Sequence, residues 1–239
     1  MGYKILAVIP ARGGSKSIHK KNISHLSGKP LIAWTIELAK RVNGISYIHI
    51  STDDKEIQNV AKLYGANCDF LRPKEISGDT DGTNQALVSS MLKLKELGHN
   101  YDYVMELQPT YCFRGKQIIE DVIKEILNNK NADSIVTCSQ IDDTSHPDFA
   151  LKVDIDGKIK YSKLKPDKFA RQTLEKFYAC KGIVMISKFD IFLDKKSFFS
   201  DRCYFFPIQN KLRMFDINYE EDLDLARIIS KKYPTLLSE

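Results

Sequence analysis

Long hydrophobic runs are missing from this sequence. No apolar stretch reaches the roughly 18 residues that a membrane-spanning helix needs, so we expect no membrane partner. The apolar stretch nearest the N-terminus, residues 5–10, leads directly into Arg12 and Lys16, which is unlike the hydrophobic region of a secretory signal. We therefore expect a cytoplasmic protein.

Cysteine is scarce, and the sequence also contains no internal repeat or low-complexity segment. The cysteines are odd in number, are scattered along the chain and form no Cys-x-x-Cys pair; they are Cys68, Cys112, Cys138, Cys180 and Cys203. This distribution gives no zinc signature and is typical of a protein from a reducing cytoplasm.

Excess charge is missing from most of the chain. Lys and Arg number 36 against 31 Asp and Glu, a net charge of +5. Residues 1–41 hold eight basic residues and one acidic residue, a net charge of +7, so the rest of the chain is about neutral. Nucleic-acid-binding proteins usually spread positive charge over a longer stripe. We therefore expect no nucleic-acid partner, and a compact polyanion such as a nucleoside triphosphate instead.

What is present is a regular alternation of strand-like and helix-like segments. Residues 3–9 are continuously aliphatic, as in a strand buried on both faces, and Lys29-Pro30 leads into a helical pattern. The predicted strands are 3–9, 47–51, 67–71, 103–107 and 134–138, and the predicted helices are 31–41, 52–64, 83–97 and 116–128. Alternation of this kind predicts an α/β fold with a doubly wound, mostly parallel sheet. The length of 239 residues is typical of one large domain, and we expect residues 1–239 to form it.

The pattern changes near residue 146. Residues 149–153 and 158–161 alternate about Asp156-Gly157, which predicts a β-hairpin. The lysine-rich stretch that follows has no helical period, so we expect an inserted β-rich arm over residues 146–180. Two short strands and a closing helix complete the pattern, at 183–186, 204–207 and 219–229.

The loop at residues 10–22, PARGGSKSIHKKN, follows the first predicted strand. In an open parallel sheet this is the carboxyl edge, where ligands bind. Gly13 and Gly14 let backbone N–H groups come close to a ligand, and Ser15 adds a hydroxyl donor. Three cations supply a planar fork and two point charges, the groups that hold phosphate oxygens: Arg12, Lys16 and Lys21. The loop predicts a phosphate-binding site.

Two common nucleotide-binding motifs are missing from this loop. The pattern GxxxxGK[ST] is absent because the lysine follows Gly-Gly-Ser, and GxGxxG is absent because the glycines are adjacent. The sequence therefore favours neither a P-loop ATPase nor a dinucleotide-dependent dehydrogenase.

The string IPARGGSKSIHKKN, followed by LSGKPLIAWTI, resembles the acylneuraminate (CMP-sialic acid) cytidylyltransferase family. The resemblance covers nearly the whole chain and continues, in the family's order, through STDDKEI at 51–57, FLRP at 70–73, LQPT at 107–110 with Arg114 four residues on, HPD at 146–148, ARQ at 170–172 and FDINYEEDL at 215–223. It implies a nucleotide-diphospho-sugar-transferase-like fold, Mg²⁺, CTP as donor, and as acceptor a 2-keto-3-deoxy sugar acid of the sialic, legionaminic or pseudaminic type. It also implies surface polysaccharide biosynthesis and a homodimer whose arm reaches the neighbouring site.

Carried over position by position, the resemblance assigns most of the nucleotide site to the loop. Arg12, Lys16 and Lys21 match the family's triphosphate-binding residues and are the catalytic candidates. Ser15 and the backbone of Gly13 and Gly14 lie beside them, and Ala11 completes the expected nucleotide-binding residues of the loop. Asn22 and Arg72 match residues around the cytidine, and Gln108 matches the glutamine near the phosphate and acceptor. Asp216 matches the first aspartate of a metal pair. No residue stands out as a general base.

The sequence departs from the family at the metal pair and at the acceptor. The second metal aspartate is replaced by Asn218, a neutral and weaker Mg²⁺ ligand that is also a good helix N-cap. Tyr111-Cys112-Phe113 stands where the family has Ser-Pro-Leu, and Lys181-Gly182 stands where it has Asn-Gly. Arg171 in the arm and Lys181 directly after it are the candidates for the acceptor carboxylate. The alternative is that both are solvated surface residues of a basic region.

Two other functions remain open on the sequence. Asp-x-Asp strings at 154–156 and 222–224 are found in nucleotide-sugar-using glycosyltransferases, but here they fall in a predicted turn and a predicted helix. A non-catalytic nucleotide-binding homologue is the other alternative, since it would tolerate the loss of a metal carboxylate.

Overall fold

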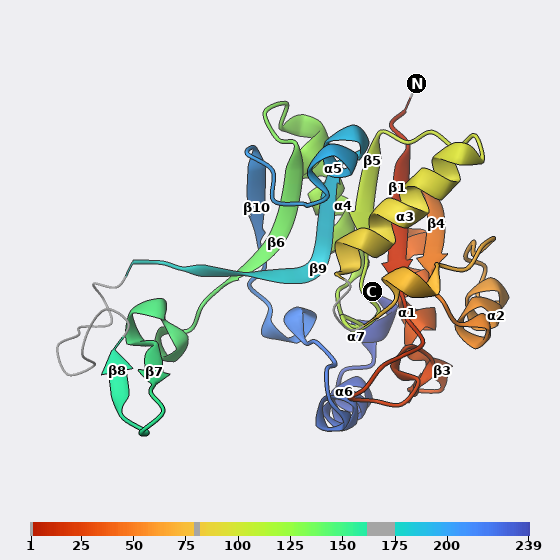
Figure 1. Cartoon of the computed structure of the whole chain (residues 1–239). Helices are drawn as coiled ribbons and strands as arrows, with labels where there is room; N and C mark the ends of the chain where they lie inside the picture. Colours follow the sequence, from red (N-terminus) through yellow and green to blue (C-terminus); the bar gives the residue numbers. More distant parts are fainter. Residues whose placement is uncertain (1, 79–81, 162–174) are drawn as a thin grey trace.

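The computed structural model describes residues 2–78, 82–161 and 175–239. Within these residues the main sheet has six strands in the order β10-β6-β9-β5-β1-β4 (Figure 1). Their bounds are Ile5–Pro10 (β1), Ile45–Ser51 (β4), Tyr103–Glu106 (β5), Ser134–Gln140 (β6), Tyr178–Lys188 (β9) and Cys203–Pro207 (β10). Strand β1 is parallel to β4 and β5, and β10 is parallel to β6, whereas β9 is antiparallel to both of its neighbours. The expected mostly parallel α/β sheet is therefore confirmed.

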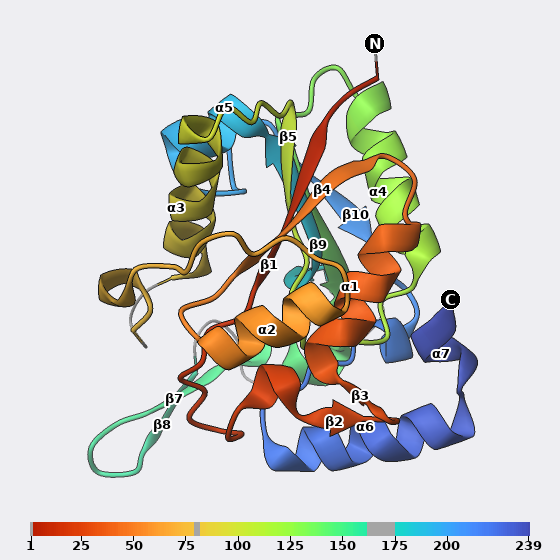
Figure 2. The ribbon, with the colours of Figure 1, turned by 90° about the vertical axis from the view of Figure 1, so that its right-hand side faces the viewer.

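Successive side chains of β1 enter the two hydrophobic layers that cover the sheet. Ile5, Ala7 and Ile9 pack with α1, α2 and α4, while Leu6 and Val8 pack with α3 and α5. Figure 2 shows these two groups of helices on opposite faces of the sheet. Because both faces of the strand are buried, its sequence is continuously aliphatic. The helices are Leu31–Arg41 (α1), Lys55–Leu63 (α2), Thr83–Glu96 (α3), Lys116–Asn128 (α4) and Phe189–Lys195 (α5).

A third hydrophobic cluster lies beyond the carboxyl ends of the parallel strands. It joins Ile18 of the loop after β1 to Phe113, Ile217 and Leu223. The elements around it are the short hairpin His25–Leu26 (β2) and Lys29–Pro30 (β3) and the helices Glu220–Lys232 (α6) and Thr235–Ser238 (α7). This cluster holds the loop after β1 against the segment that precedes α6.

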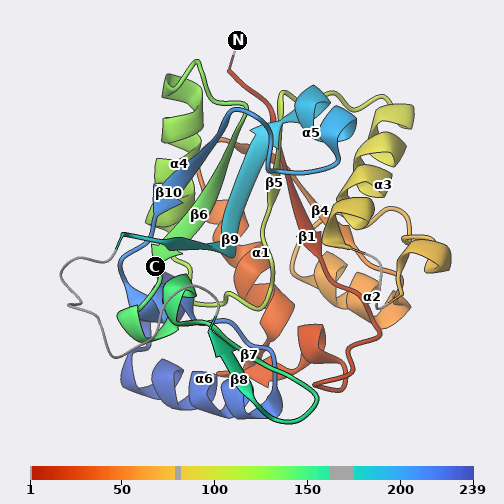
Figure 3. The same cartoon turned by 60° about the vertical axis from the view of Figure 1, so that its left-hand side comes forward.

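The hairpin of the expected arm stands apart from the sheet (Figures 1 and 3). Its strands, Leu151–Val153 (β7) and Ile159–Tyr161 (β8), pair in antiparallel register about a turn in which Gly157 has a φ of +76°. Such a positive φ favours glycine. The eleven-residue strand β9 leads from this region into the middle of the sheet.

Most predicted elements are confirmed, including both bounds of α1 and α4. The strand predicted at 67–71 is wrong: Asn67 makes one bridge with His49, and the chain then turns so that the N–H of Arg72 donates to the carbonyl of Thr52. The N-cap of α3 is Gly82, which provides no side-chain hydrogen bond. No helix in the described segments has both the length and the apolar character needed to cross a bilayer.

Candidate active site

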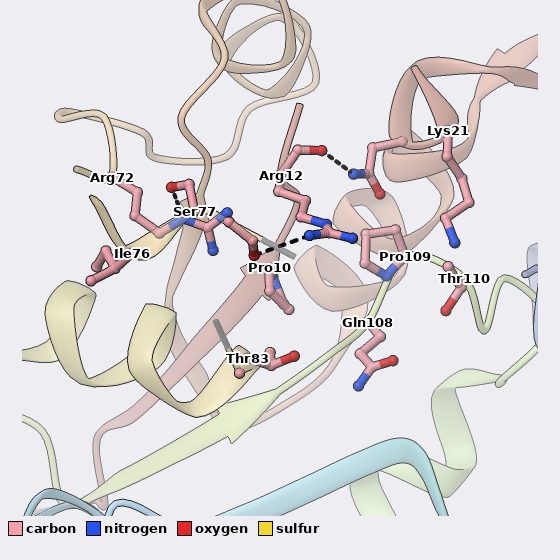
Figure 4. Close-up of a pocket in the computed structure, with 13 residues that line it drawn as sticks. Pro10, Arg12, Lys21, Arg72, Ile76, Ser77, Thr83, Gln108, Pro109 and Thr110 are labelled. Carbon is pink, nitrogen blue, oxygen red and sulfur yellow. Dashed lines mark hydrogen bonds between the residues drawn. The ribbon is translucent and has the colours of Figure 1, made fainter. Parts of the chain in front are cut away.

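A cavity of about 310 Å³ opens at the carboxyl edge of the sheet (Figure 4). Its size is at the lower end of the range usual for small-molecule sites. Five residues predicted from the sequence line it, namely Arg12, Lys21, Asn22, Arg72 and Gln108. A second hollow shares three of these residues and adds Ser15, Lys16 and Asn218, so the two hollows adjoin. The structure thus brings the residues predicted for the phosphates and the cytidine, together with Gln108, to one place.

Gly13 fixes the loop after β1 against the start of α2. Its N–H donates to Asp53 Oδ1 at 2.9 Å, and a Cβ at this position would lie 2.7 Å from Asp54 Oδ2. Asp54 in turn caps α2 by accepting from the N–H groups of Glu56 and Ile57. Only glycine allows the loop to pack this closely against the helix N-terminus.

The rest of the loop is held by hydrogen bonds between neighbouring segments. The N–H of Ala11 donates to Ser51 O at 2.9 Å, and the Asn22 amide donates to Arg12 O at 3.0 Å. Gly14 has open space at its Cβ position, so its backbone is accessible. Together these contacts keep the main chain of the loop at the mouth of the cavity.

The cations of the loop lie at the junction of the two hollows. The Arg12 guanidinium donates to Gly78 O at 3.1 Å, and the Lys21 ammonium donates to Ile217 O at 3.2 Å. Burial lowers the pKa of Lys21, while the nearby carboxylate of Asp216 opposes that effect. A partly desolvated ammonium interacts more strongly with an anion than an exposed one does. This cluster is therefore suited to the oxygens of a polyphosphate.

Arg72 forms the opposite wall of the cavity, as Figure 4 shows. Its side chain is buried, its Nε donates to Ser77 Oγ at 3.0 Å, and its guanidinium pairs with Asp53 Oδ1 at 3.7 Å. The same carboxylate oxygen accepts from Gly13, so Asp53 connects the two walls. The sequence reasoning missed Asp53, although it stands within the STDDKEI string.

Asp216 and Asn218 lie beside the second hollow, in the segment before α6. The Asn218 amide donates to Asp216 Oδ2 at 3.0 Å, whereas Asp216 Oδ1 is buried and has no hydrogen-bond partner among the described residues. The N-cap of α6 is Tyr219, whose N–H donates to Asp222 Oδ2 at 2.9 Å, so the alternative of Asn218 as the N-cap is wrong. An unsatisfied carboxylate oxygen beside the cations of the loop fits Mg²⁺, which usually takes one or two carboxylates and completes its shell with substrate phosphates and water.

Gln108 points away from the cations of the loop (Figure 4). Its Nε2 donates to Glu106 Oε1 at 2.8 Å, and a Cβ on Gly182 would lie 2.9 Å from the same nitrogen. Gly182 therefore allows β9 to approach the Gln108 amide. Its neighbour Lys181 lines neither hollow, and Arg171 lies outside the described residues.

The segment that departs from the family lies underneath this site. Arg114 is fully buried and donates to the carbonyls of Gln108 and Tyr111. The Tyr111 hydroxyl lies against Asp216 and the N–H of Gly182, and burial raises the pKa of this phenol. Phe113 packs in the third hydrophobic cluster. Tyr111 thus connects the candidate metal carboxylate to β9, a role that the sequence did not indicate.

Neither Asp-x-Asp string belongs to this site. Asp154 and Asp156 lie in the turn between β7 and β8, and Asp222 and Asp224 lie in α6. None of the four lines either hollow. Their positions give no support to a glycosyltransferase site.

Comparison with known proteins finds relatives over nearly the whole chain. The profile of a family described as cytidylyltransferase matches residues 6–233. The CMP-N,N'-diacetyllegionaminic acid synthase of Legionella pneumophila is 33% identical over 83% of this chain and 84% of its own. The pseudaminic acid cytidylyltransferase of Campylobacter jejuni is 30% identical over 95% and 97%. A solved CMP:2-keto-3-deoxy-manno-octonic acid synthetase in complex with CTP has the same fold, with a TM-score of 0.71, 17% identity, and coverage of 96% and 99%.

Proposed function

The chain belongs to the cytidylyltransferase family, and we propose that it joins the CMP moiety of CTP to a 2-keto-3-deoxy sugar acid. The acceptor class is a nonulosonic acid of the legionaminic, pseudaminic or sialic type. One observation carries the proposal: Arg12, Lys21, Asn22, Arg72 and Gln108 converge on a single cavity at the carboxyl edge of the sheet.

In the proposed reaction the anomeric hydroxyl of the sugar acid attacks the α-phosphorus of CTP. The new bond joins the anomeric oxygen to that phosphorus, the bond to the bridging oxygen of the β-phosphate breaks, and pyrophosphate and a proton are released. Transfer of this kind depends on positioning and charge stabilisation more than on covalent catalysis. Arg12, Lys16 and Lys21 stabilise the charge that develops on the phosphate oxygens. Arg72 and Asn22 hold the cytidine side of the cavity.

The residues that would hold Mg²⁺ are Asp216, through its unsatisfied oxygen, and Asn218, through its amide oxygen. When bound, the ion neutralises phosphate charge. Lys21 lies close enough to Asp216 for its pKa to respond to that carboxylate. The Asp216 carboxylate therefore favours the charged form of the Lys21 ammonium and opposes the effect of burial.

The proposed assembly is a homodimer in the cytoplasm. The hairpin β7–β8 exposes four large apolar side chains, Leu151, Val153, Ile155 and Ile159. An exposed cluster of this kind is typical of an interaction surface. Light scattering should give the mass of two chains for the wild type and of one chain for a Val153→Asp, Ile155→Asp double variant. A monomeric wild type would remove this part of the proposal.

The reaction is tested by pyrophosphate release with CTP, Mg²⁺ and a panel of sugar acids. The panel contains N,N'-diacetyllegionaminic acid, pseudaminic acid and N-acetylneuraminic acid. Release should require a sugar acid and should prefer CTP to UTP and ATP. Release without a sugar acid, or with UTP or ATP in preference, would refute the proposal, and CTP binding without turnover would favour a non-catalytic homologue.

A further inference from the structure

Glu106 is a fully buried carboxyl group at the end of β5, next to the acceptor side of the cavity. Its residue neighbours in the strand, Val104 and Met105, belong to the two hydrophobic layers of the sheet. Carboxyl groups are almost never fully buried unless they are paired. Its hydrogen bond with the side chain of Gln108, which lines the cavity, connects it to the candidate site.

The contact with Glu106 fixes the orientation of the Gln108 amide. A carboxylate only accepts hydrogen bonds, so the NH₂ group of Gln108 must face Glu106, as the 2.8 Å distance from Nε2 to Oε1 shows. Gly182 packs against the same nitrogen. The side-chain oxygen of Gln108, Oε1, accepts no hydrogen bond from the described part of the chain. It is the end of the amide that remains for a ligand.

This arrangement is unfavourable for the fold itself. Glu106 Oε2 is buried and has no hydrogen-bond partner among the described residues. Burial raises the pKa of Glu106 to about 7, although the Gln108 hydrogen bond and the Arg114 charge both act to lower it. An apolar residue in this strand would avoid that penalty. A buried carboxyl that lowers stability beside a ligand cavity is typical of a functional group.

We propose that Glu106 is a positioning residue that sets the hydrogen-bond character of the acceptor site. By holding the NH₂ group of Gln108, it presents the amide carbonyl to the sugar acid. The site therefore favours an acceptor that offers a hydrogen-bond donor at this position, a hydroxyl or an acylamino N–H. This inference rests on the proposed function and deepens it.

The kinetic test compares an apolar replacement with a conservative one. Glu106→Leu releases the amide, and we expect the KM for the best sugar acid of the panel to rise about 2- to 13-fold, the effect of one lost hydrogen bond. The KM for CTP should stay within about twofold. Glu106→Gln keeps an acceptor oxygen and should recover most of the loss. If Glu106→Leu does not fold, Glu106→Met provides an unbranched apolar chain of similar length.

Ser134→Ala is the matched control for this series. Ser134 is also a fully buried polar side chain in the sheet, but it lies at the opposite end of the strands, where its hydroxyl bonds to Phe198 O. We expect no change in either KM. Equal changes in the two KM values for Glu106→Leu, or no rescue by Glu106→Gln, would overturn the proposal.

A second test does not depend on turnover. The side-chain NH₂ signal of Gln108, identified by its loss in Gln108→Glu, should shift in NMR spectra as the pH passes through the region near 7. The other groups that interact with Glu106 are Arg114, which stays charged there, and Cys180 on β9. The shift should persist in Cys180→Ser and vanish in Glu106→Gln.

The two tests separate the inference from the proposed function. If no sugar acid reacts, the proposed function is wrong. Independently of that result, a Gln108 side-chain NMR signal that does not change with pH would overturn the proposed Glu106–Gln108 contact. A titrating signal combined with an unchanged acceptor KM in Glu106→Leu would overturn the acceptor role.

Discussion

Replacing Glu106 by glutamine should stabilise the protein, and more so as the pH rises. The pKa of this carboxyl is raised from 4.5 to about 7, so the folded state binds its proton more tightly than the unfolded state. The wild type therefore loses stability as the pH rises from 4.5 to about 7. At 1.36 kcal/mol per pH unit, the loss amounts to about 3 kcal/mol. Glutamine carries no proton that dissociates in this range, so the variant avoids the loss.

The assay is urea unfolding of wild type and Glu106→Gln at pH 5 and pH 8. The variant's advantage in free energy of unfolding should be larger at pH 8 by about 2–3 kcal/mol. Glu120→Gln on α4 is the control, because the N–H of Asn43 lowers the pKa of Glu120 and the pH effect should be small and opposite in sign. An advantage of Glu106→Gln that is equal at both pH values would refute the reasoning.

Three further predictions concern the site. Lys21→Ala should reduce the turnover number by about 10²–10³, the usual effect of losing one charge-stabilising contact. Lys20→Ala should leave turnover unchanged, because the Lys20 ammonium pairs with Glu56. Equal losses of pyrophosphate release in the two variants would contradict this prediction. Gly13→Ala places a Cβ against Asp54, and should raise the KM for CTP severalfold with a fold that remains native by circular dichroism; an unchanged KM would show that the loop adapts. Asp216→Asn should raise the Mg²⁺ concentration needed for half-maximal rate at least about tenfold. The measurement is a Mg²⁺ titration at saturating CTP, and an unchanged half-maximal Mg²⁺ concentration would exclude this carboxylate as a ligand.

The phosphate loop was predictable from the sequence because its chemistry is local. Its glycines and cations follow a continuously aliphatic strand, and a strand buried on both faces places the next loop at a sheet edge. The placement of Arg12 and Lys21 at the cavity follows from that order alone. The helices α1 and α4 were predictable for the same reason, because the spacing of their apolar residues is a local property of the sequence.

The remainder of the site depends on contacts between distant segments. The strand predicted at 67–71 fails because the Arg72 N–H bonds to Thr52 instead of continuing the sheet. The burial of Glu106 depends on an antiparallel strand, β9, that arrives about eighty residues later in the chain and pairs with β5. The link from Asp53 to both walls of the cavity is likewise tertiary. Only the STDDKEI string gave a signal that could have identified Asp53 earlier.

The loop after β1 also has a consequence for biosynthesis. Its Ser17 hydroxyl and Lys21 ammonium bond to main-chain oxygens that stand 201 and 196 residues further along the chain, at Asn218 and Ile217. Synthesis proceeds from the N-terminus at about 5–20 residues per second. At this rate, on the order of ten seconds or more pass between synthesis of the loop after β1 and synthesis of the segment before α6 that holds it. The contacts that hold the loop after β1 against the segment before α6 therefore form only after most of the chain has been synthesised.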